Sequence, residues 1–435
     1  MTQQQKSHVL PIIMMIFLFG MISFVTNLAS PMGDVLKNQF TVANWMGTLG
    51  VFANFIAYAV MGIPGGIMLQ KLGYKKTALI AIAIGFAGVG IQTLSGLIDS
   101  SAAFGVYIMG AFVAGFSMCL LNTVVNPMLN TLGGGGNKGN QLIQIGGSFN
   151  SLCGTAVIVL VGILVGDIAK AQISDVYPIM FIALAIFALA FVVIGLASIP
   201  EPHKITETTS EKSQYSPLSF RHFVLGAIAI FVYVGVEVGI PKVLFSWLVD
   251  ADLNVLGTSP EQASSIAGFV TATYWFLMLI GRLLGAALGA KISSKVMLST
   301  VSVVGLVLVL FAIFSNVATK VNLPVLMNNA GSLSFGTALV PINAALLVLV
   351  GLCTSIMWGS IFNLAVEGLG KYTAKASGYF MVLVCGGGIL PLLQNAIVDV
   401  STYSVSYWVI VAGLAYLLFY AVAGSKNVNK NIPVD

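Results

Sequence analysis

The sequence predicts an all-α membrane protein with twelve transmembrane helices in two similar six-helix halves. Only 8% of the 435 residues are charged and 58% are hydrophobic, with a mean hydropathy of +0.98. Soluble domains carry about 25% charged residues, so this chain has too few charges to cover a soluble surface. Twelve long apolar stretches, and short motifs that recur in both halves, are the other two observations.

The number of helices follows from the length of the apolar stretches, because a membrane-spanning helix needs about 20 mostly apolar residues. A polar stretch at 201–221 is rich in charged residues, Ser and Thr, as expected of a solvated linker. We therefore expect a six-helix bundle over 1–200 and a second one over 222–435. The expected spans are 9–33, 44–70, 77–98, 103–130, 141–166, 177–199, 222–248, 263–289, 294–315, 338–365, 374–399 and 404–424.

Lys and Arg residues predict the orientation of the helices. With an even number of helices, both termini and the linker lie on one side of the membrane. Fifteen of the nineteen Lys and Arg residues, Arg282 among them, are expected on that side. Because loops rich in Lys and Arg stay in the cytoplasm, we expect both termini and the linker there. This bias explains the small net charge of +5 without nucleic-acid binding.

Two motif pairs recur in the same order at matching helices of the two halves. They are Gly65-x5-Lys71-x3-Lys75 with Gly285-x5-Lys291-x3-Lys295, after helices 2 and 8, and Asn126-x5-Leu132 with Asn363-x5-Leu369, at the ends of helices 4 and 10. Parallel repeats of this kind are a transporter architecture, with the substrate site between the halves near the midplane. We expect helix 1 beside helix 7 about a central cavity.

Six stretches resemble one family of transporters. They are "NLASPMGDVLKNQF", "LNTVVNPML", "GSFNSLCG", "RHFVLGAIAIFVYVG", "GRLLGAALGAKISSKVML" and "GGGILP". Together with the Gly–Lys loops they resemble the major facilitator superfamily, and within it the fucose–galactose–glucose symporters of the L-fucose permease group. Gln70 stands where the loop motif of the superfamily has an acidic residue.

The resemblance covers nearly the whole chain and implies a function. The implied protein is a sugar–cation symporter that works by alternating access in a bacterial inner membrane. Its coupling ion is H⁺ or Na⁺, and it has no cofactor or bound metal. Its partners are a small sugar and the lipid bilayer, and it is a monomer.

Glu237 lies about fourteen residues into helix 7, roughly 21 Å into a hydrocarbon core about 30 Å thick. Ionisable residues at such depth are costly and usually face the bundle interior. We expect Glu237 to carry the cation coupling. The alternative is a structural ion pair with Lys242. Fucose permeases have functional carboxylates in helices 1 and 4, where this sequence aligns Ser30 and Asn122.

Amide and aromatic side chains inside the spans are the candidates for sugar binding. Amides bond to sugar hydroxyls, whereas an aromatic face packs on the C–H side of the ring. For each amide the alternative is a hydrogen bond between helices, worth about 0.6 kcal/mol. The candidates are Asn27, Asn122, Gln144, Asn150, Asn363, Gln394 and Asn395, with Tyr233, Tyr274, Trp275 and Trp358.

A third set of residues is expected to support structure or gating. Proline has no backbone N–H, so Pro127 leaves the backbone carbonyl one turn earlier without its helical hydrogen bond. We expect the neighbouring Asn126 to donate a hydrogen bond to that carbonyl. The other members of this set are Gly65, Lys71, Lys75, Arg282, Gly285, Lys291 and Lys295.

Two further functions are alternatives to sugar symport. One is a symporter or facilitator for an amino sugar, sialic acid or another small polar solute. The other is a membrane receptor or enzyme, which would need a soluble domain, a nucleophile–base pair or a metal cluster. The four cysteines have no metal-ligand spacing, and the three histidines lie at or outside the ends of apolar stretches.

Overall fold

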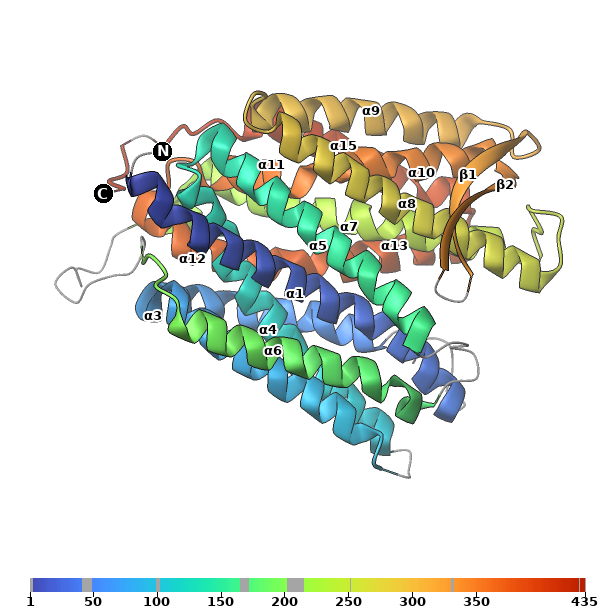
Figure 1. Ribbon diagram of the computed structural model, residues 1–435. Helices are drawn as coiled ribbons and strands as arrows, with labels where there is room; N and C mark the ends of the chain where they lie inside the picture. Colours follow the sequence, from blue (N-terminus) through green and yellow to red (C-terminus); the bar gives the residue numbers. More distant parts are fainter. Residues whose placement is uncertain are drawn as a thin grey trace.

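The computed structural model describes residues 3–40, 49–98, 102–164, 172–201, 215–250, 252–329, 332–429 and 431–434 (Figure 1). The first half contains α1 (Gln3–Phe40), α3 (Leu49–Ser95), α4 (Ala102–Leu132), α5 (Gly136–Leu164), η1 (Ile173–Val176) and α6 (Tyr177–Leu196). The second half begins with η3 (Pro217–Ser219), α7 (Arg221–Val249), α8 (Pro260–Leu288), α9 (Ser294–Phe314), β1 (Lys320–Asn329) and β2 (Ser332–Pro341). It continues with α10 (Ile342–Thr354), α11 (Met357–Val366), η4 (Gly370–Tyr372), α12 (Thr373–Val382), η5 (Leu383–Cys385), α13 (Gly386–Val400), α14 (Tyr403–Ser406), α15 (Trp408–Phe419) and η6 (Tyr420–Gly424).

The described helices are compatible with twelve membrane crossings. Ten helical segments are long and apolar enough to cross a membrane. One of them lies in α3 and contains two crossings, because the backbone breaks at Gly73 with a φ of 83°. The 29-residue helix α5 adds the twelfth. The predicted number of twelve is compatible with this arrangement.

The turn at Gly73 is tied to the end of α6. The carboxylate of Glu201 accepts hydrogen bonds from the backbone N–H groups of Tyr74 and Lys75, which begin the second part of α3. The ammonium of Lys75 donates to the carbonyl of Ala197 at 2.7 Å. A side chain at position 73 would collide with Glu201, and its φ is one that only glycine adopts easily. A carboxylate is favourable here because helix N-termini carry partial positive charge.

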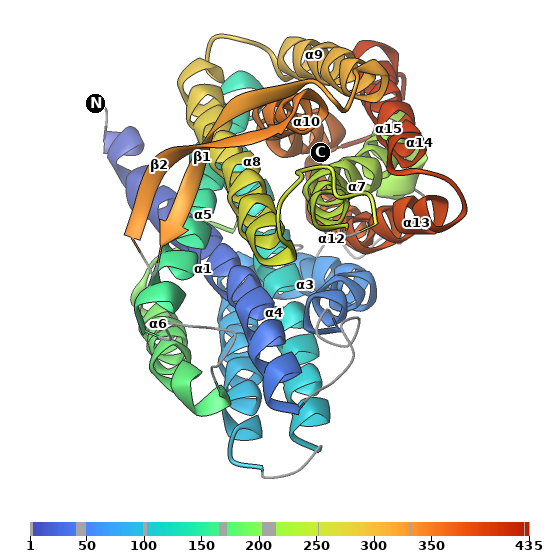
Figure 2. The ribbon, with the colours of Figure 1, turned by 90° about the vertical axis from the view of Figure 1, so that its right-hand side faces the viewer.

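The helices form two groups, and a few helices of each group make the contact between them. Seen from the end that carries the strands, α1, α3, α4 and α6 lie together, and α7, α9, α10, α13 and α15 lie together (Figure 2). The groups pack against each other through α5 with α8 and through α3 with α12. The prediction that helix 1 lies beside helix 7 is wrong in this conformation. Here α1 packs mainly on α5 and α4, whereas α7 packs mainly on α13 and α11.

Glycines bring α3 and α12 into backbone contact. A methyl group on Gly378 would lie 2.6 Å from the Cα atom of Gly66 and 2.5 Å from the carbonyl oxygen of Gly62. Small residues four apart allow this close approach between membrane helices. Close backbone packing therefore leaves no space for water between the two halves at this contact.

We expect Gly378→Ala to force α3 and α12 apart. A water-soluble maleimide should then label a cysteine placed at the buried Thr123 several-fold faster than in the parent protein. Gly90→Ala is the matched control, because a methyl group at that helical glycine meets nothing within 4 Å. Equal labelling rates in the Gly378 variant and its parent would contradict the sealing role.

A β-hairpin replaces the predicted loop between helices 9 and 10. Strands β1 and β2 pair antiparallel from Lys320 opposite Pro341 to Asn329 opposite Ser332. The backbone N–H of Leu326 donates to the Thr273 hydroxyl near the middle of α8 at 2.9 Å, and this bond attaches the hairpin to that helix. Helix α10 therefore begins at Ile342, four residues later than predicted.

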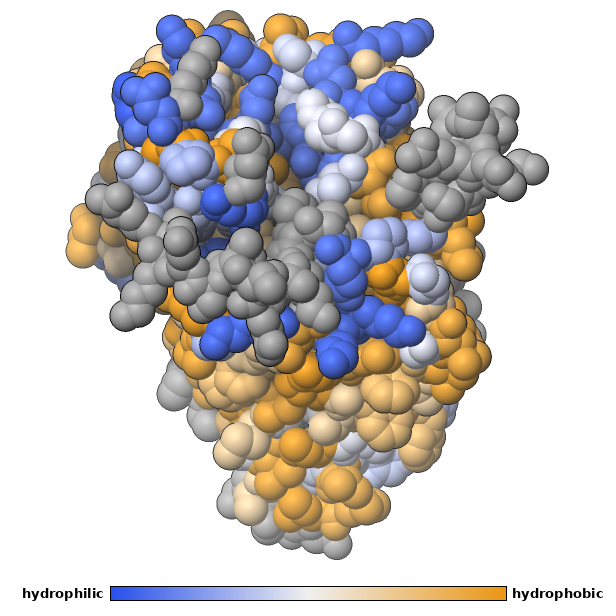
Figure 3. Space-filling view, turned by 90° about the vertical axis from the view of Figure 1, so that its left-hand side faces the viewer, coloured by the Kyte–Doolittle hydropathy of each residue, from blue (hydrophilic) through white to orange (hydrophobic). Residues whose placement is uncertain are grey.

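Both termini lie at the same end of the bundle, opposite the hairpin (Figure 1). Hydrophilic side chains gather on this end, whereas hydrophobic ones cover the flank visible beside it (Figure 3). This distribution fits helices that cross a bilayer.

Candidate functional site between the two halves

Glu237 forms an ion pair with Arg282. The pair joins α7 to α8, with Arg282 Nη2 at 3.3 Å from Glu237 Oε1. Each side chain is only 13% exposed. The alternative pairing with Lys242 is wrong, because Lys242 is exposed and makes no ion pair with Glu237. Pairing makes the deep carboxylate tolerable, since an unpaired charge is expensive away from water.

The other side of the Arg282 guanidinium binds α5 in the opposite half. Its Nη1 atom donates to the hydroxyl of Ser151 at 2.8 Å, to the carbonyl of Gly147 at 3.1 Å and to Oδ1 of Asn150 at 3.4 Å. Asn150 in turn donates to the carbonyl of Phe19 on α1 at 2.7 Å. Arg282 therefore lies between the halves and not at the membrane surface, where the charge count had placed it.

Two tyrosines surround the ion pair. The hydroxyl of Tyr274 donates to the backbone carbonyl of Glu237 at 3.2 Å and lies 3.0 Å from the hydroxyl of Thr354 on α10. Tyr233 lies one turn before Glu237, and its buried hydroxyl lies beside the Glu237 carboxylate. Both tyrosine rings are fully buried, so in this conformation neither offers an open face to a sugar.

A second polar network connects the halves through α4 and α11. Asn122 donates to the hydroxyl of Tyr58 on α3 at 2.7 Å, and Asn126 donates to the backbone carbonyl of Asn122 at 2.9 Å. The indole N–H of Trp358 donates to Oδ1 of Asn126 at 3.0 Å. The Trp358 ring also makes edge contacts with Tyr233 and Phe380 at centroid distances of 6.3 and 6.1 Å.

The backbone carbonyl that Pro127 leaves without a helical hydrogen bond accepts one from the other half. The hydroxyl of Ser377 on α12 donates to the carbonyl of Thr123 at 3.1 Å. The expectation that Asn126 serves it is therefore wrong, because Asn126 bonds to Asn122 and Trp358. A proline in α4 thus creates an acceptor that only the opposite half satisfies in this conformation.

Two predicted sugar-binding amides hold the halves together near the end that carries the termini. Gln144 on α5 donates to the carbonyl of Ile356 at 2.9 Å. Asn363 accepts from Asn130 on α4 at 2.6 Å and donates to the hydroxyl of Ser294 at 2.8 Å. All of these groups are neutral, so amide hydrogen bonds make this contact.

We expect Asn363→Ala to weaken the contact between the halves. The change leaves the buried amide of Asn130 unpaired, and each unsatisfied buried group costs about 1–3 kcal/mol. A lower midpoint of thermal unfolding in detergent would measure the loss. In the double variant Asn130→Ala/Asn363→Ala the second substitution should add little. Additive losses would show that the two residues do not act as a pair.

The remaining predicted sugar-binding residues are scattered. Asn27 donates to the carbonyl and hydroxyl of Ser23 on its own helix. Gln394 is fully buried against α7, and neither its side-chain nitrogen nor its oxygen has a partner. Asn395 is half-buried, and Trp275 is 40% exposed. The structure therefore brings Asn150 to the ion pair, and Asn122 and Trp358 to the second network.

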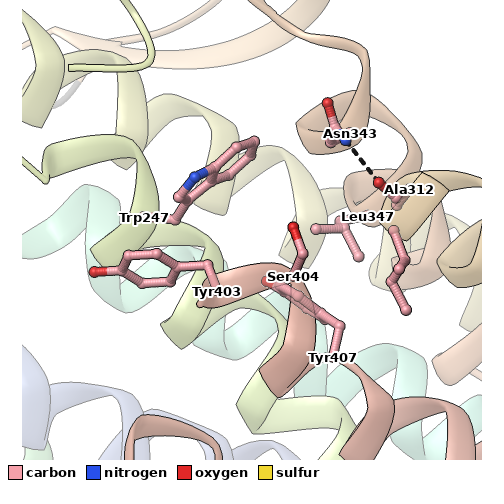
Figure 4. A pocket seen from close by; sticks show the side chains of 8 residues that line it. Trp247, Ala312, Asn343, Leu347, Tyr403, Ser404 and Tyr407 are labelled. Atoms are coloured by element: carbon pink, nitrogen blue, oxygen red, sulfur yellow. Dashed lines mark hydrogen bonds between the residues drawn. The ribbon is translucent and has the colours of Figure 1, made fainter. Parts of the chain in front are cut away.

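A separate pocket lies near the hairpin end of the second half (Figure 4). Its cavity of about 20 Å³ has room for about one water and not for a sugar. Asn343 lines it and donates to the carbonyl of Ala312 at 2.6 Å, as Figure 4 shows. The pocket is therefore separate from the candidate sugar site.

Comparison with known proteins decides the family. A model of the Major Facilitator Superfamily matches residues 12–392. The chain belongs to this superfamily. The superfamily consists of transporters, so the protein is a transporter and not an enzyme, and the predicted resemblance is confirmed.

Several relatives of the transporter match over nearly its whole length. The glucose/galactose transporter of Brucella abortus is 29% identical, covering 98% of this chain and 97% of the relative. The putative glucose/galactose transporter of Helicobacter pylori is 30% identical, covering 97% and 98%. The L-fucose-proton symporter of Escherichia coli is 22% identical, covering 91% and 88%. The crystal structure of the transporter FucP in the outward conformation shares the fold, with a TM-score of 0.77, 19% identity and coverage of 97% and 100%.

The repeated motifs of the transporter lie where helices approach closely. Gly65 packs on Leu120 of α4, and Gly285 packs on Ile356 and Gln144. Lys71, Lys291 and Lys295 are exposed, whereas Lys75 is tied to Ala197. The side chain of Ser30 lies outside the described residues.

Sequence reasoning missed three contacts at the candidate site of the transporter. These are the pairing of Arg282 with Glu237, the bond from Asn122 to Tyr58, and the bond from Ser377 to Thr123. A signal for the first was present, because Arg282 lies inside the expected span 263–289. A tyrosine or serine in an apolar helix gives no comparable signal.

Proposed function

We propose that this transporter imports a neutral hexose, such as glucose, galactose or fucose, by cation-coupled symport. The observation that carries the proposal is the buried Glu237–Arg282 pair, which lies between the halves beside amide groups. The relatives, a glucose/galactose transporter and an L-fucose-proton symporter, support both the sugar substrate and the cation coupling.

We propose that the sugar binds between the ion pair and the second polar network. Asn150 is partly exposed, and its Oδ1 atom is only weakly engaged by Arg282 at 3.4 Å, so it is available to a sugar hydroxyl. Trp358 is partly exposed and offers an aromatic surface for the C–H side of the ring. The other candidates are Asn27, Asn122, Gln144, Tyr274, Trp275, Asn363, Gln394 and Asn395. The hydrogen bonds that several of them now make to other helices or to their own helix would have to open before they could bind a sugar.

Glu237 is the proposed coupling group, with H⁺ or Na⁺ as the ion. A carboxylate that alternates between a charged and a neutral state changes its interaction with Arg282. That difference between states is what links two fluxes, because a ligand shifts a conformational equilibrium only by its differential affinity for the two states.

The proposed arrangement in the cell follows from the charge distribution. Residues 1–200 and 222–435 are proposed as the two moving bodies, joined by the linker 201–221. The transporter is proposed to act as a monomer in a bacterial inner membrane, with both termini in the cytoplasm. The excess of Lys and Arg expected at the end with the termini supports this orientation.

A carboxylated sugar such as sialic acid fits the site less well than a neutral hexose. Arg282 is the cation at the candidate site among the described residues, and it is already engaged by Glu237 and by α5. An anionic substrate would have to displace Glu237 from it.

Uptake of radiolabelled sugars into proteoliposomes tests the proposal. We expect glucose, galactose or fucose to accumulate under an inward H⁺ or Na⁺ gradient and only to equilibrate without one. Labelled N-acetylglucosamine and sialic acid serve as comparisons. Accumulation of sialic acid alone would contradict the neutral-hexose proposal, and equal uptake with and without both gradients would contradict symport.

A further inference from the structure

Arg282 is one of only two arginines in the chain. The other, Arg221, begins α7 and is exposed. Arg282 instead extends from α8 into the contact between the halves, where 13% of its side chain is exposed. Because arginine keeps its charge in proteins, this position holds a permanent cation.

The two sides of the Arg282 guanidinium bind different kinds of groups. Nη2 binds a charged carboxylate within its own half, Glu237. Nη1 binds only neutral oxygen atoms in the other half, on Ser151, Gly147 and Asn150. The charge of Arg282 is therefore balanced by α7, whereas its contact across the halves is made with α5.

We propose that Arg282 is the positioning residue through which the charge state of Glu237 controls the contact between the two halves. The inference rests on the proposed function where it takes Glu237 as the coupling group. It adds a residue that is not itself titrated and that carries the state of the cation site to α5.

The physical reason is the cost of an unbalanced buried cation. With Glu237 ionised, the pair is neutral overall and the guanidinium is tolerated between α5 and α8. When a proton or a sodium ion neutralises Glu237, the guanidinium keeps only neutral acceptors. Removing one partner of a buried ion pair is strongly destabilising. Water must then reach Arg282, and this requires α5 and α8 to separate.

In the part of the chain that the structure describes, few other groups that titrate face the pair. Tyr233 lies on α7, Tyr274 on α8, Cys353 on α10, and Tyr407 precedes α15 and donates to a backbone carbonyl of α7. Tyrosine and cysteine ordinarily titrate above about pH 8. Helix α5 faces the guanidinium with a hydroxyl, an amide and a carbonyl, α11 faces Tyr233 with an indole, and α13 faces α7 with an amide. A response to acid between about pH 4 and 8 is therefore assigned to Glu237.

Distance measurements between spin labels test the inference without sugar. The labels are placed on Lys138→Cys of α5 and Lys295→Cys of α9, two exposed positions in opposite halves. Asn140 contacts Met297 at 3.5 Å, so these helix starts are close in this conformation. The full chain is measured in lipid nanodiscs, with its four native cysteines replaced.

We expect acid to increase the population with a long label distance in the parent protein. Glu237→Gln should show this population at every pH, raised by about fivefold or more over the parent at pH 8. Glu237→Gln/Arg282→Gln, in which the charge is removed from both partners, should return to the short distance at every pH. Arg221→Gln, the matched arginine control, should behave like the parent.

The inference is overturned if Glu237→Gln keeps the short distance or if the double variant keeps the long one. If the double glutamine variant does not fold, Glu237→Leu/Arg282→Leu replaces it, because apolar residues often substitute for a buried ion pair without loss of stability.

Sugar accumulation by the same variants in proteoliposomes separates this inference from the proposed function. Accumulation by Glu237→Gln would overturn coupling at Glu237. The distances alone decide the role of Arg282.

Discussion

Replacing Glu237 by glutamine is expected to abolish accumulation of sugar against a gradient while sugar exchange across the membrane continues. Glutamine mimics the neutral carboxyl group, so the site remains permanently in its loaded form. In the parent protein the ionised carboxylate holds Arg282, and breaking a buried ion pair costs about 3–5 kcal/mol. A bias of that size corresponds to more than about a hundredfold difference between the two states, and the variant loses it.

Two assays in proteoliposomes measure this result. Counterflow of labelled sugar reports exchange, and uptake under an ion gradient reports accumulation. Glu367→Gln is the control, because Glu367 is an exposed carboxylate at the end of α11. If Glu237→Gln concentrates sugar as well as the parent does, the coupling group lies elsewhere, and Asp399 on α13 becomes the next candidate.

Replacing Trp358 by alanine is expected to reduce both sugar binding and transport by tenfold or more. The change removes the hydrogen bond to Asn126 and the ring contacts with Tyr233 and Phe380. Truncation of a large aromatic residue typically costs about 3–5 kcal/mol. In this case the loss affects the contact between the halves and the proposed surface for the sugar ring together.

A milder substitution separates these two roles of Trp358. Trp358→Phe keeps an aromatic face but loses the indole donor, so it should retain most of the sugar affinity and weaken only the contact with α4. Isothermal titration of the purified protein with glucose, galactose and fucose measures the affinity. Trp408→Ala, at a ring that is 47% exposed, controls for loss of a tryptophan. Unchanged affinity in Trp358→Ala would move the sugar site away from α11.

The crossings of the membrane could be predicted from the sequence. Each crossing needs about 20 apolar residues in a row, and such runs are visible without knowing the neighbours of a helix. The hairpin at β1 and β2 was not predicted, because its strands are too short to be judged by that criterion and contain Pro324 and several asparagines. The turn at Gly73 was expected between helices 2 and 3, but its bond to Glu201 was not.

The candidate site was predicted only in part. Glu237 was identified because a carboxylate in an apolar helix needs a reason, and that reasoning requires no partner. Its partner Arg282 was not predicted, because the contact between α7 and α8 depends on how the helices pack and not on their spacing in the sequence. Gln144 and Asn363 were identified as buried amides, but the sequence left open whether they bind a sugar or another helix.

The sequence by itself determined the class of protein, its architecture of many membrane-crossing helices and the presence of a deep carboxylate, because each depends on local composition. Only the tertiary structure decided that Arg282 pairs with Glu237, that Ser377 donates to the carbonyl of Thr123, and that hydrogen bonds between side-chain amides hold the halves together. The physical reason is that these helices are apolar on the side facing lipid as well as on the side facing protein. Hydrophobic periodicity reveals the buried face of a helix in a soluble protein. In this chain it therefore does not predict which side of a helix packs against which neighbouring helix.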